Sequence, residues 1–158
     1  GLSSVFSSYA PTLQSFVNNG GVAIVLASYK NNSYNNIFNT GLLQGNYYGG
    51  INGSYGYIPN PSHELCKNLL PNYFYGYNNT VALNITNPNC QKLVTYMGRD
   101  IFSVVSQGKG YVVYIGYDFY FNYINQYQQI IDNVFGWIKN SQKFVPPEKA
   151  QLITMLFI

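Results

Sequence analysis

Charged side chains are scarce in this sequence. Asp, Glu, Lys and Arg together make up 8% of its 158 residues, against about 25% in ordinary soluble proteins. The eight cations are scattered between Lys30 and Lys149 and leave a net charge of only +3. Because a nucleic-acid surface needs clustered cations that contact phosphates, this scatter excludes nucleic acid as a partner.

Long apolar runs are lacking as well. The run at residues 152–158 is far shorter than the roughly 20 residues of a membrane-spanning helix, so we expect no membrane span within this chain, although a parent protein could be anchored. The length of 158 residues suits one domain with a buried core. We expect a single α/β domain at residues 1–143, followed by a tail at residues 144–158 that packs back or exchanges with a neighbour.

Histidine occurs once, and this excludes most metal and acid–base chemistry. His63-Glu64 does not complete the zinc motif H-E-x-x-H, because residue 67 is a lysine, and one His with one Glu cannot hold a metal. A dyad of His63 with Cys66 lacks a visible oxyanion loop. We therefore expect no catalytic residue, no metal, no cofactor and no enzymatic activity.

Carboxylates are also few, and a glycoside hydrolase would need two of them. The five available are Glu64, Asp100, Asp118, Asp132 and Glu148. Asp118 follows an expected strand, and open α/β sheets bind ligands at strand ends. Asp118 is therefore a candidate ligand-binding residue, with capping of the following loop as the alternative.

Two cysteines, Cys66 and Cys90, have no C-x-x-C or His-rich surroundings. A disulfide between them would close a loop of about 25 residues and would stabilise the fold by on the order of 3 kcal/mol. Such a bond indicates an oxidising compartment. The alternative is two buried thiols.

Uncharged polar residues stand where charge is missing, with 21 Asn and 17 Tyr. Amides and phenols do not change at low pH, whereas ion pairs are lost when carboxylates are protonated. This composition is similar to that of secreted proteins from thermoacidophilic archaea. N-x-S/T sequons predict glycosylation of an exported chain. The sequons are at Asn31, Asn52, Asn78 and Asn84.

Tyrosines and asparagines gather between residues 28 and 77 without a clear period. Long loops of this kind usually carry a function or are disordered. Tyr supplies rigid amphipathic area and Asn supplies adaptable hydrogen bonds, so this region predicts a surface for carbohydrate or peptide, with a solvated surface as the alternative. The candidate binding residues are Tyr47, Tyr48, Tyr55, Tyr57 and Asp118.

Hydrophobic periodicity predicts the regular elements. Apolar spacing near 3.6 residues indicates helices, and β-branched runs bounded by turn residues indicate strands. The predicted helices span residues 9–18, a short segment at 89–97, and 123–139. The predicted strands span residues 22–27, 73–77 and 80–86, and a hairpin at 101–116 that turns at Gly108-Lys109-Gly110.

Three motifs in this order resemble the class I glutamine amidotransferase-like superfamily. They are Phe16-Val17-Asn18-Asn19-Gly20-Gly21 before a buried strand, Gly108-Lys109-Gly110 before another, and residues 133–138 in the last helix. The resemblance covers residues 9–140 and implies a flavodoxin-like three-layer sandwich. Its sheet would be mostly parallel, with a C-terminal β-hairpin, a closing amphipathic helix and long Asn/Tyr-rich loops.

Catalytic members of that superfamily carry a cysteine on the elbow after the strand that here ends near Ala27. This chain has Ala27-Ser28-Tyr29-Lys30 there, so the resemblance implies a non-catalytic member. We expect an extracellular structural or binding domain of a cell-surface assembly, with other surface-protein subunits or glycans as partners. The alternatives are a carbohydrate- or peptide-recognition domain and a degenerate hydrolase around Asp118 and Glu64.

Overall fold

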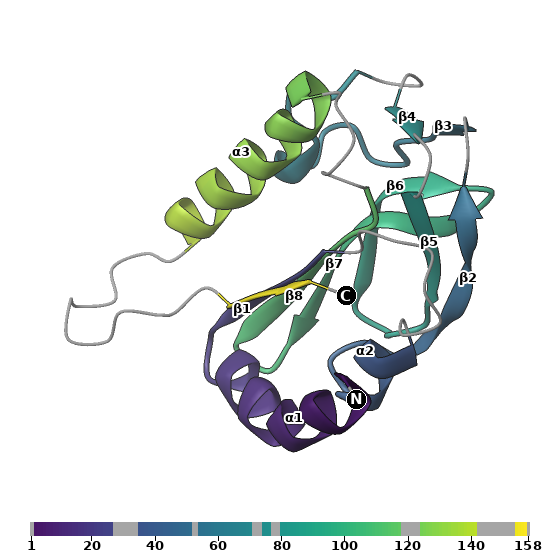
Figure 1. Ribbon diagram of the computed structural model, residues 1–158. Helices are drawn as coiled ribbons and strands as arrows, with labels where there is room; N and C mark the ends of the chain where they lie inside the picture. The colour runs from purple at the N-terminus through teal and green to yellow at the C-terminus, as the bar shows by residue number, and fades with distance from the viewer. Residues whose placement is uncertain are drawn as a thin grey trace.

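The computed structural model describes residues 2–26, 35–51, 54–70, 74–76, 80–117, 124–141 and 154–157 (Figure 1). Its helices are α1 (Leu2–Asn18), α2 (Asn35–Asn39), the 3-10 turn η2 (Glu64–Cys66) and α3 (Ile124–Ser141). Its strands are β1 (Val22–Leu26), β2 (Gly45–Ile51), β3 (Ser54–Gly56), β4 (Phe74–Gly76), β5 (Thr80–Ile85), β6 (Cys90–Tyr96), β7 (Arg99–Gln107), β8 (Gly110–Ile115) and β9 (Thr154–Phe157).

Seven of these strands form one mixed sheet. Its order is β2-β5-β7-β8-β1-β9, with β6 paired to β7 outside this path. The pairs β2–β5, β5–β7, β6–β7 and β7–β8 are antiparallel, whereas β1 runs parallel to both β8 and β9. The expectation of a mostly parallel, flavodoxin-like sheet is therefore wrong. Two-residue turns join β6 to β7 and β7 to β8, and such short connections allow only antiparallel pairing.

The predicted buried strand is confirmed as β1. Its Val22, Ile24 and Leu26 join the apolar cluster on one face of the sheet, and Ala23 and Val25 join the cluster on the other face. A strand covered on both faces needs apolar residues at every position, which explains the continuous run in the sequence.

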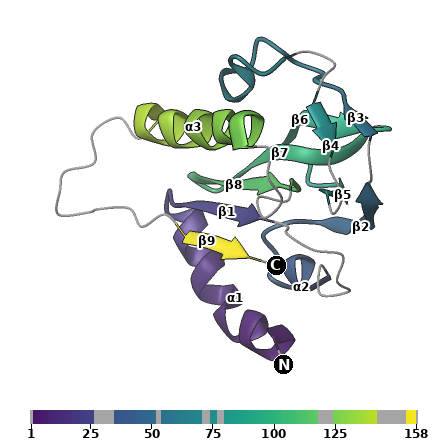
Figure 2. The same ribbon diagram turned by 45° about the horizontal axis from the view of Figure 1, so that its top comes forward.

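The helices cover both faces of the sheet. Figure 2 shows α3 on one side of the strands and α1 with α2 on the other. The buried stripe of α3 contains Tyr127, Ile130, Val134 and Ile138, as its helical spacing predicts. The predicted helix at residues 9–18 is also present, as the second half of α1.

The short helix expected at residues 89–97 is wrong, because this segment forms β6. Strand β6 shifts its register against β7 between Lys92 and Thr95, and a bulge of this kind disturbs the regular alternation of side chains. As a result, the consecutive Leu93 and Val94 are both buried in the cluster on the α3 face. Two adjacent buried apolar residues are typical of one face of a helix and not of an alternating strand, which explains the error.

The predicted hairpin is confirmed as β7 and β8, which pair from Phe102–Ile115 to Gln107–Gly110. The turn residue Gly108 has φ of +58°, a backbone conformation that glycine adopts without steric cost. Strand β9 forms one edge of the sheet and pairs in parallel with β1. Residues 154–157 therefore extend the chain's own sheet.

Candidate ligand pocket

A patch of side chains faces α3 at one end of β6, β7 and β8. Gln91 pairs with Val104 across β6 and β7, and Ser106 pairs with Tyr111 across β7 and β8. Directly opposed residues share a face of an antiparallel sheet, and so do residues two apart on one strand. Val104 belongs to the apolar cluster beneath α3, so all four side chains lie on the α3 side.

Helix α3 and the turn η2 form the walls above this patch. The ring of Trp137 on α3 meets the ring of Tyr111 edge-on, with 4.8 Å between centroids and 71° between planes. The Asn133 amide donates hydrogen bonds to the Leu65 carbonyl at 3.0 Å and to the Lys67 carbonyl at 2.7 Å. Asn133 thereby ties η2 to α3 and sets the position of the residue before η2.

That residue is His63, and both of its ring nitrogens are engaged. Its Nδ1 accepts from the Leu65 backbone N–H at 3.1 Å, and its Nε2 lies 2.9 Å from Gln91 Oε1. A nitrogen that accepts a hydrogen bond carries no proton, so the neutral ring is protonated on Nε2 and donates to Gln91. This bond orients the Gln91 amide, because its oxygen must face His63.

These walls border a cavity of about 200 Å³ that is open to solvent on one side, where Asn89, Gln91 and Ser106 are exposed. Among the described residues, its lining combines an imidazole, two amides, a hydroxyl and two aromatic rings, without a carboxylate or a cation. The lining residues are His63, Asn89, Gln91, Val104, Ser106, Tyr111 and Trp137. Such a site can donate and accept hydrogen bonds beside an apolar wall, and this is the general composition of small-molecule sites.

The dyad of His63 with Cys66, which we expected not to act, is not assembled. The Cys66 thiol is buried and donates to the Leu93 carbonyl at 3.7 Å, while the His63 nitrogens bond Leu65 and Gln91. Among the described residues, no group of three His, Cys, Asp or Glu side chains gathers in a way that could hold a metal ion.

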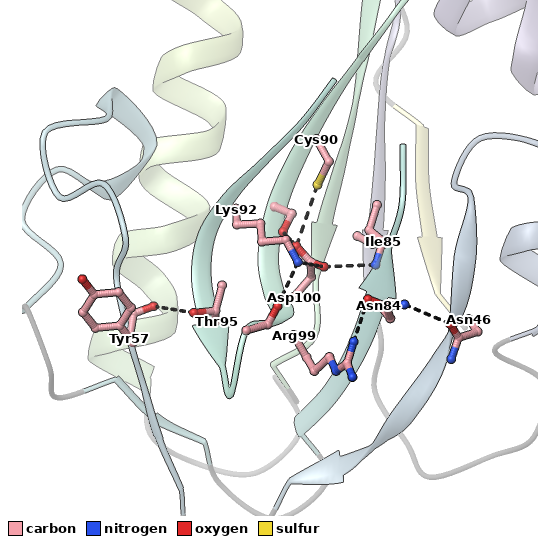
Figure 3. Close-up of polar contacts among 11 residues, drawn as sticks. Asn46, Tyr57, Asn84, Ile85, Cys90, Lys92, Thr95, Arg99 and Asp100 are labelled. Carbon is pink, nitrogen blue, oxygen red and sulfur yellow. Dashed lines mark hydrogen bonds and ion pairs between the residues drawn. The ribbon is translucent and has the colours of Figure 1, made fainter. Parts of the chain in front are cut away.

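A second polar cluster lies inside the sheet and is centred on Asp100 (Figure 3). This fully buried carboxylate accepts from the Ile85 N–H at 3.0 Å, Lys92 Nζ at 3.0 Å and Ser103 Oγ at 2.6 Å. The Cys90 thiol adds a contact at 3.8 Å. Because these donors come from β5, β6 and β7 and occupy the carboxylate, Asp100 joins three strands and is not available to a ligand.

The expected disulfide between Cys66 and Cys90 is wrong, because the two thiols are unbonded. Cys66 belongs to the apolar cluster on the α3 face, whereas Cys90 packs against the cluster on the α1 face. Two side chains on opposite faces of one sheet cannot be bridged without backbone movement.

Both thiols are poor nucleophiles in the folded protein. Burial raises the pKa of Cys66 from 9.0 to about 11. Burial, followed by the nearby negative charge of Asp100, raises the pKa of Cys90 to about 12. Since the thiolate is the reactive form, we expect almost no thiol labelling of the folded protein at pH 8 and labelling of both cysteines in urea without a reductant. Mass spectrometry after alkylation would measure this labelling. If both cysteines stayed unlabelled in urea, the disulfide would exist after all.

The expectation of a glycoprotein is not supported at the one sequon within the described residues. Asn84 lies on β5, where its Nδ2 donates to Asn46 Oδ1 at 3.1 Å and its Oδ1 accepts from Arg99 at 2.8 Å (Figure 3). An acceptor asparagine must present a free amide in an exposed segment. The sequons at Asn31, Asn52 and Asn78 lie outside the described residues.

Of the tyrosines predicted to bind a ligand, the three with described side chains, Tyr47, Tyr48 and Tyr57, do not line the pocket. Tyr48 on β2 is 45% exposed and lies under the Arg99 guanidinium, 5.1 Å from the ring centroid. Tyr57 is 59% exposed, and its backbone pairs with Thr95 of β6. Tyr47 is half-buried on β2, and the backbone of Tyr55 pairs with β4. The side chain of Tyr55 and the whole of Asp118 lie outside the described residues.

The sequence interpretation missed Gln91, Ser106 and Trp137 as site residues. Gln91 was placed on a helix, so its pairing with β7 could not be foreseen. One signal was present in Val104-Val105-Ser106, where a hydroxyl occupies a position that alternation assigns to the same face as a core valine. Nothing in the sequence indicated that His63 would lie beside Gln91.

No family model and no curated protein matches the chain. The solved structure of the cytoplasmic protein STM3548 from Salmonella typhimurium is similar, with a TM-score of 0.61 and 13% sequence identity over 81% of this chain. The match spans 59% of the length of that protein. At this identity the likeness concerns the fold alone, so the amidotransferase-like resemblance stays a prediction.

The expectation of an extracellular location does not hold, because the disulfide from which an oxidising compartment was inferred is not formed between Cys66 and Cys90. The structural neighbour, whose likeness concerns the fold alone, is described as a cytoplasmic protein. In the part of the chain that the structure describes, no helix has both the length and the apolar character needed to cross a membrane.

Proposed function

We propose that this chain is a non-catalytic binding domain that recognises a small uncharged ligand in the pocket between β6–β8, η2 and α3. The observation that carries this proposal is the cavity lining, which combines two aromatic rings with neutral amide, hydroxyl and imidazole groups. Aromatic walls supply apolar contact, and a few placed polar groups supply orientation.

The lining argues for an uncharged ligand. A charged group that leaves water for a cavity needs a partner of opposite charge, and none of the described residues that line this one is Asp, Glu, Lys or Arg. The volume of about 200 Å³ lies below the range of about 300–1,000 Å³ for drug-sized ligands. The pocket therefore suits a single ring or a molecule of similar size.

The arrangement of His63 argues for binding without catalysis. A general base must be free to take a proton from its substrate, but His63 Nδ1 is occupied by the Leu65 N–H and Nε2 already carries a proton. His63 therefore cannot act as a general base for the exposed Ser106. The role that these contacts support is a fixed hydrogen-bonding frame.

Trp137 offers a direct test, because it is the only tryptophan in the sequence. We expect small uncharged molecules from a fragment set to shift its fluorescence in a saturable way, and two-dimensional amide NMR spectra to place the changes at Gln91 and Ser106. Gln91→Met keeps the side-chain length, removes one hydrogen-bonding amide, and should weaken binding about five-fold.

Gln128→Met is the matched control, since Gln128 is exposed on α3 and its side chain bonds only Asp132 within the described ranges. This variant should bind like the wild type. If no uncharged fragment perturbs Trp137, or if charged fragments bind as well as neutral ones, the proposal is refuted.

A further inference from the structure

We infer that the ligand of this pocket is a neutral polyhydroxylated ring, a single pyranose unit of a sugar. This inference rests on the proposed binding function and names the chemical class of the ligand. The geometry that supports it is the combination of an angled aromatic wall with amide and hydroxyl groups on the neighbouring strands.

The wall is formed by Tyr111 and Trp137, which are both half-buried and meet at 71°. Aromatic faces are apolar but carry a negative quadrupole. A pyranose ring presents polarised C–H groups on its faces, and these fit against such a surface. Because both rings line the cavity, one ring-sized molecule bound there can contact both.

The polar side of the pocket matches hydroxyl groups in particular. Asn89, Gln91 and Ser106 are exposed and line the cavity together, and an amide or a hydroxyl can both donate and accept. A sugar hydroxyl does the same, so neighbouring hydroxyls can bond to one amide. A wholly apolar ring would cover these groups without replacing their bonds to water, which is unfavourable.

His63 adds a constraint on the direction of one of these bonds. Since His63 Nε2–H donates to Gln91 Oε1, the Gln91 oxygen is engaged and its NH₂ group is turned away from His63. Gln91 therefore acts chiefly as a donor toward the ligand, and a hydroxyl oxygen is a suitable acceptor. The Leu65 N–H on Nδ1 keeps this arrangement in place.

Charged sugars are disfavoured by the surroundings of the pocket. In the part of the chain that the structure describes, no residue lining the pocket carries a charge that could pair with a uronate carboxylate. Glu64 follows His63 directly and its carboxylate lies 3.5 Å from the Asn140 amide, so the charged residue of η2 itself is negative. A glucuronate should therefore bind more weakly than the corresponding glucoside.

The test is a titration of the full chain, monitored by Trp137 fluorescence and by amide NMR. The neutral sugar probes are the methyl pyranosides of glucose, galactose, mannose and N-acetylglucosamine. Sodium glucuronate is the charged probe, and phenol is the aromatic probe. We expect at least one methyl pyranoside to bind with a Kd on the order of a millimolar, as a ligand of about 13 non-hydrogen atoms should. Glucuronate should bind at least about ten-fold more weakly.

Variants decide whether the binding uses this pocket. Gln91→Met should weaken pyranoside binding about five-fold or more, and Gln128→Met should leave it unchanged. Thermal melting would show that both variants are folded. Equal pyranoside affinity for the two variants would overturn the inference, because the sugar would then bind elsewhere.

The outcomes also separate this inference from the binding function on which it rests. If phenol or another neutral fragment binds at Gln91 and Ser106 while no pyranoside does, the sugar class is wrong and the binding pocket stands. If no neutral probe of any kind binds there, both proposals fail.

Discussion

Gly110→Ala should destabilise the protein by about 3 kcal/mol or more, which is a large part of the stability of a typical domain. A Cβ atom at Gly110 would overlap the backbone carbonyl oxygens of Val17 and Gly21. These atoms belong to the end of α1 and the turn that leads into β1, and backbone cannot move aside as a flexible side chain can. Urea denaturation monitored by circular dichroism would measure the loss in the free energy of unfolding.

The matched control is Gly136→Ala on α3, where an added Cβ meets no atom within 4 Å. Alanine is the better helix former, so this variant should gain roughly 0.5–1 kcal/mol. Opposite signs for the same chemical change would show that close backbone approach at Gly110, and not the loss of glycine itself, causes the effect. Two small effects of equal sign would contradict the packing of α1 against β8.

Asp100→Ala should cost about 3 kcal/mol. The change leaves the Ile85 N–H and Ser103 Oγ without their buried acceptor and takes the ion-pair partner from Lys92. Each buried polar group left unbonded costs about 1–3 kcal/mol. The Lys92 contribution is small because its side chain is 35% exposed and therefore screened by water.

Asp132→Ala provides the comparison, because Asp132 is exposed on α3 and, among the described residues, its side chain bonds only Gln128 one turn before it. Surface changes of this kind stay within about 0.5 kcal/mol. Urea denaturation of both variants would separate the buried carboxylate from the exposed one. A loss below about 1 kcal/mol for Asp100→Ala would show that β5, β6 and β7 do not depend on this cluster.

The hydrophobic pattern predicted those elements that contact the core along their whole length. The stripe of α3 and the doubly covered run of β1 were foreseen because each element contacts the core along its whole length. Strand β2 was not foreseen, and its residues are exposed or half-buried except for Ile51. An edge strand with little burial carries no hydrophobic pattern, so the Asn/Tyr-rich segment resembled a loop.

The pocket could not be predicted, because its members come from four separate elements, β6, β7, β8 and α3, and from the segments that precede η2 and β6. Gln91, Ser106 and Trp137 acquire a shared function only through the register of β6 with β7 and the position of α3. The sequence singled out His63 as the sole histidine, but the orientation of its ring depends on the Leu65 N–H and the Gln91 oxygen.

The sequence by itself determined the scarcity of charge, the apolar strand β1, the β7–β8 hairpin and the amphipathic α3, because each depends on composition or on neighbours a few residues apart. Tertiary structure alone decided the strand directions, the opposite faces of Cys66 and Cys90, and the pocket. The physical reason is that strand pairing joins residues far apart in the chain, and a shift of one position moves every side chain to the other face of the sheet.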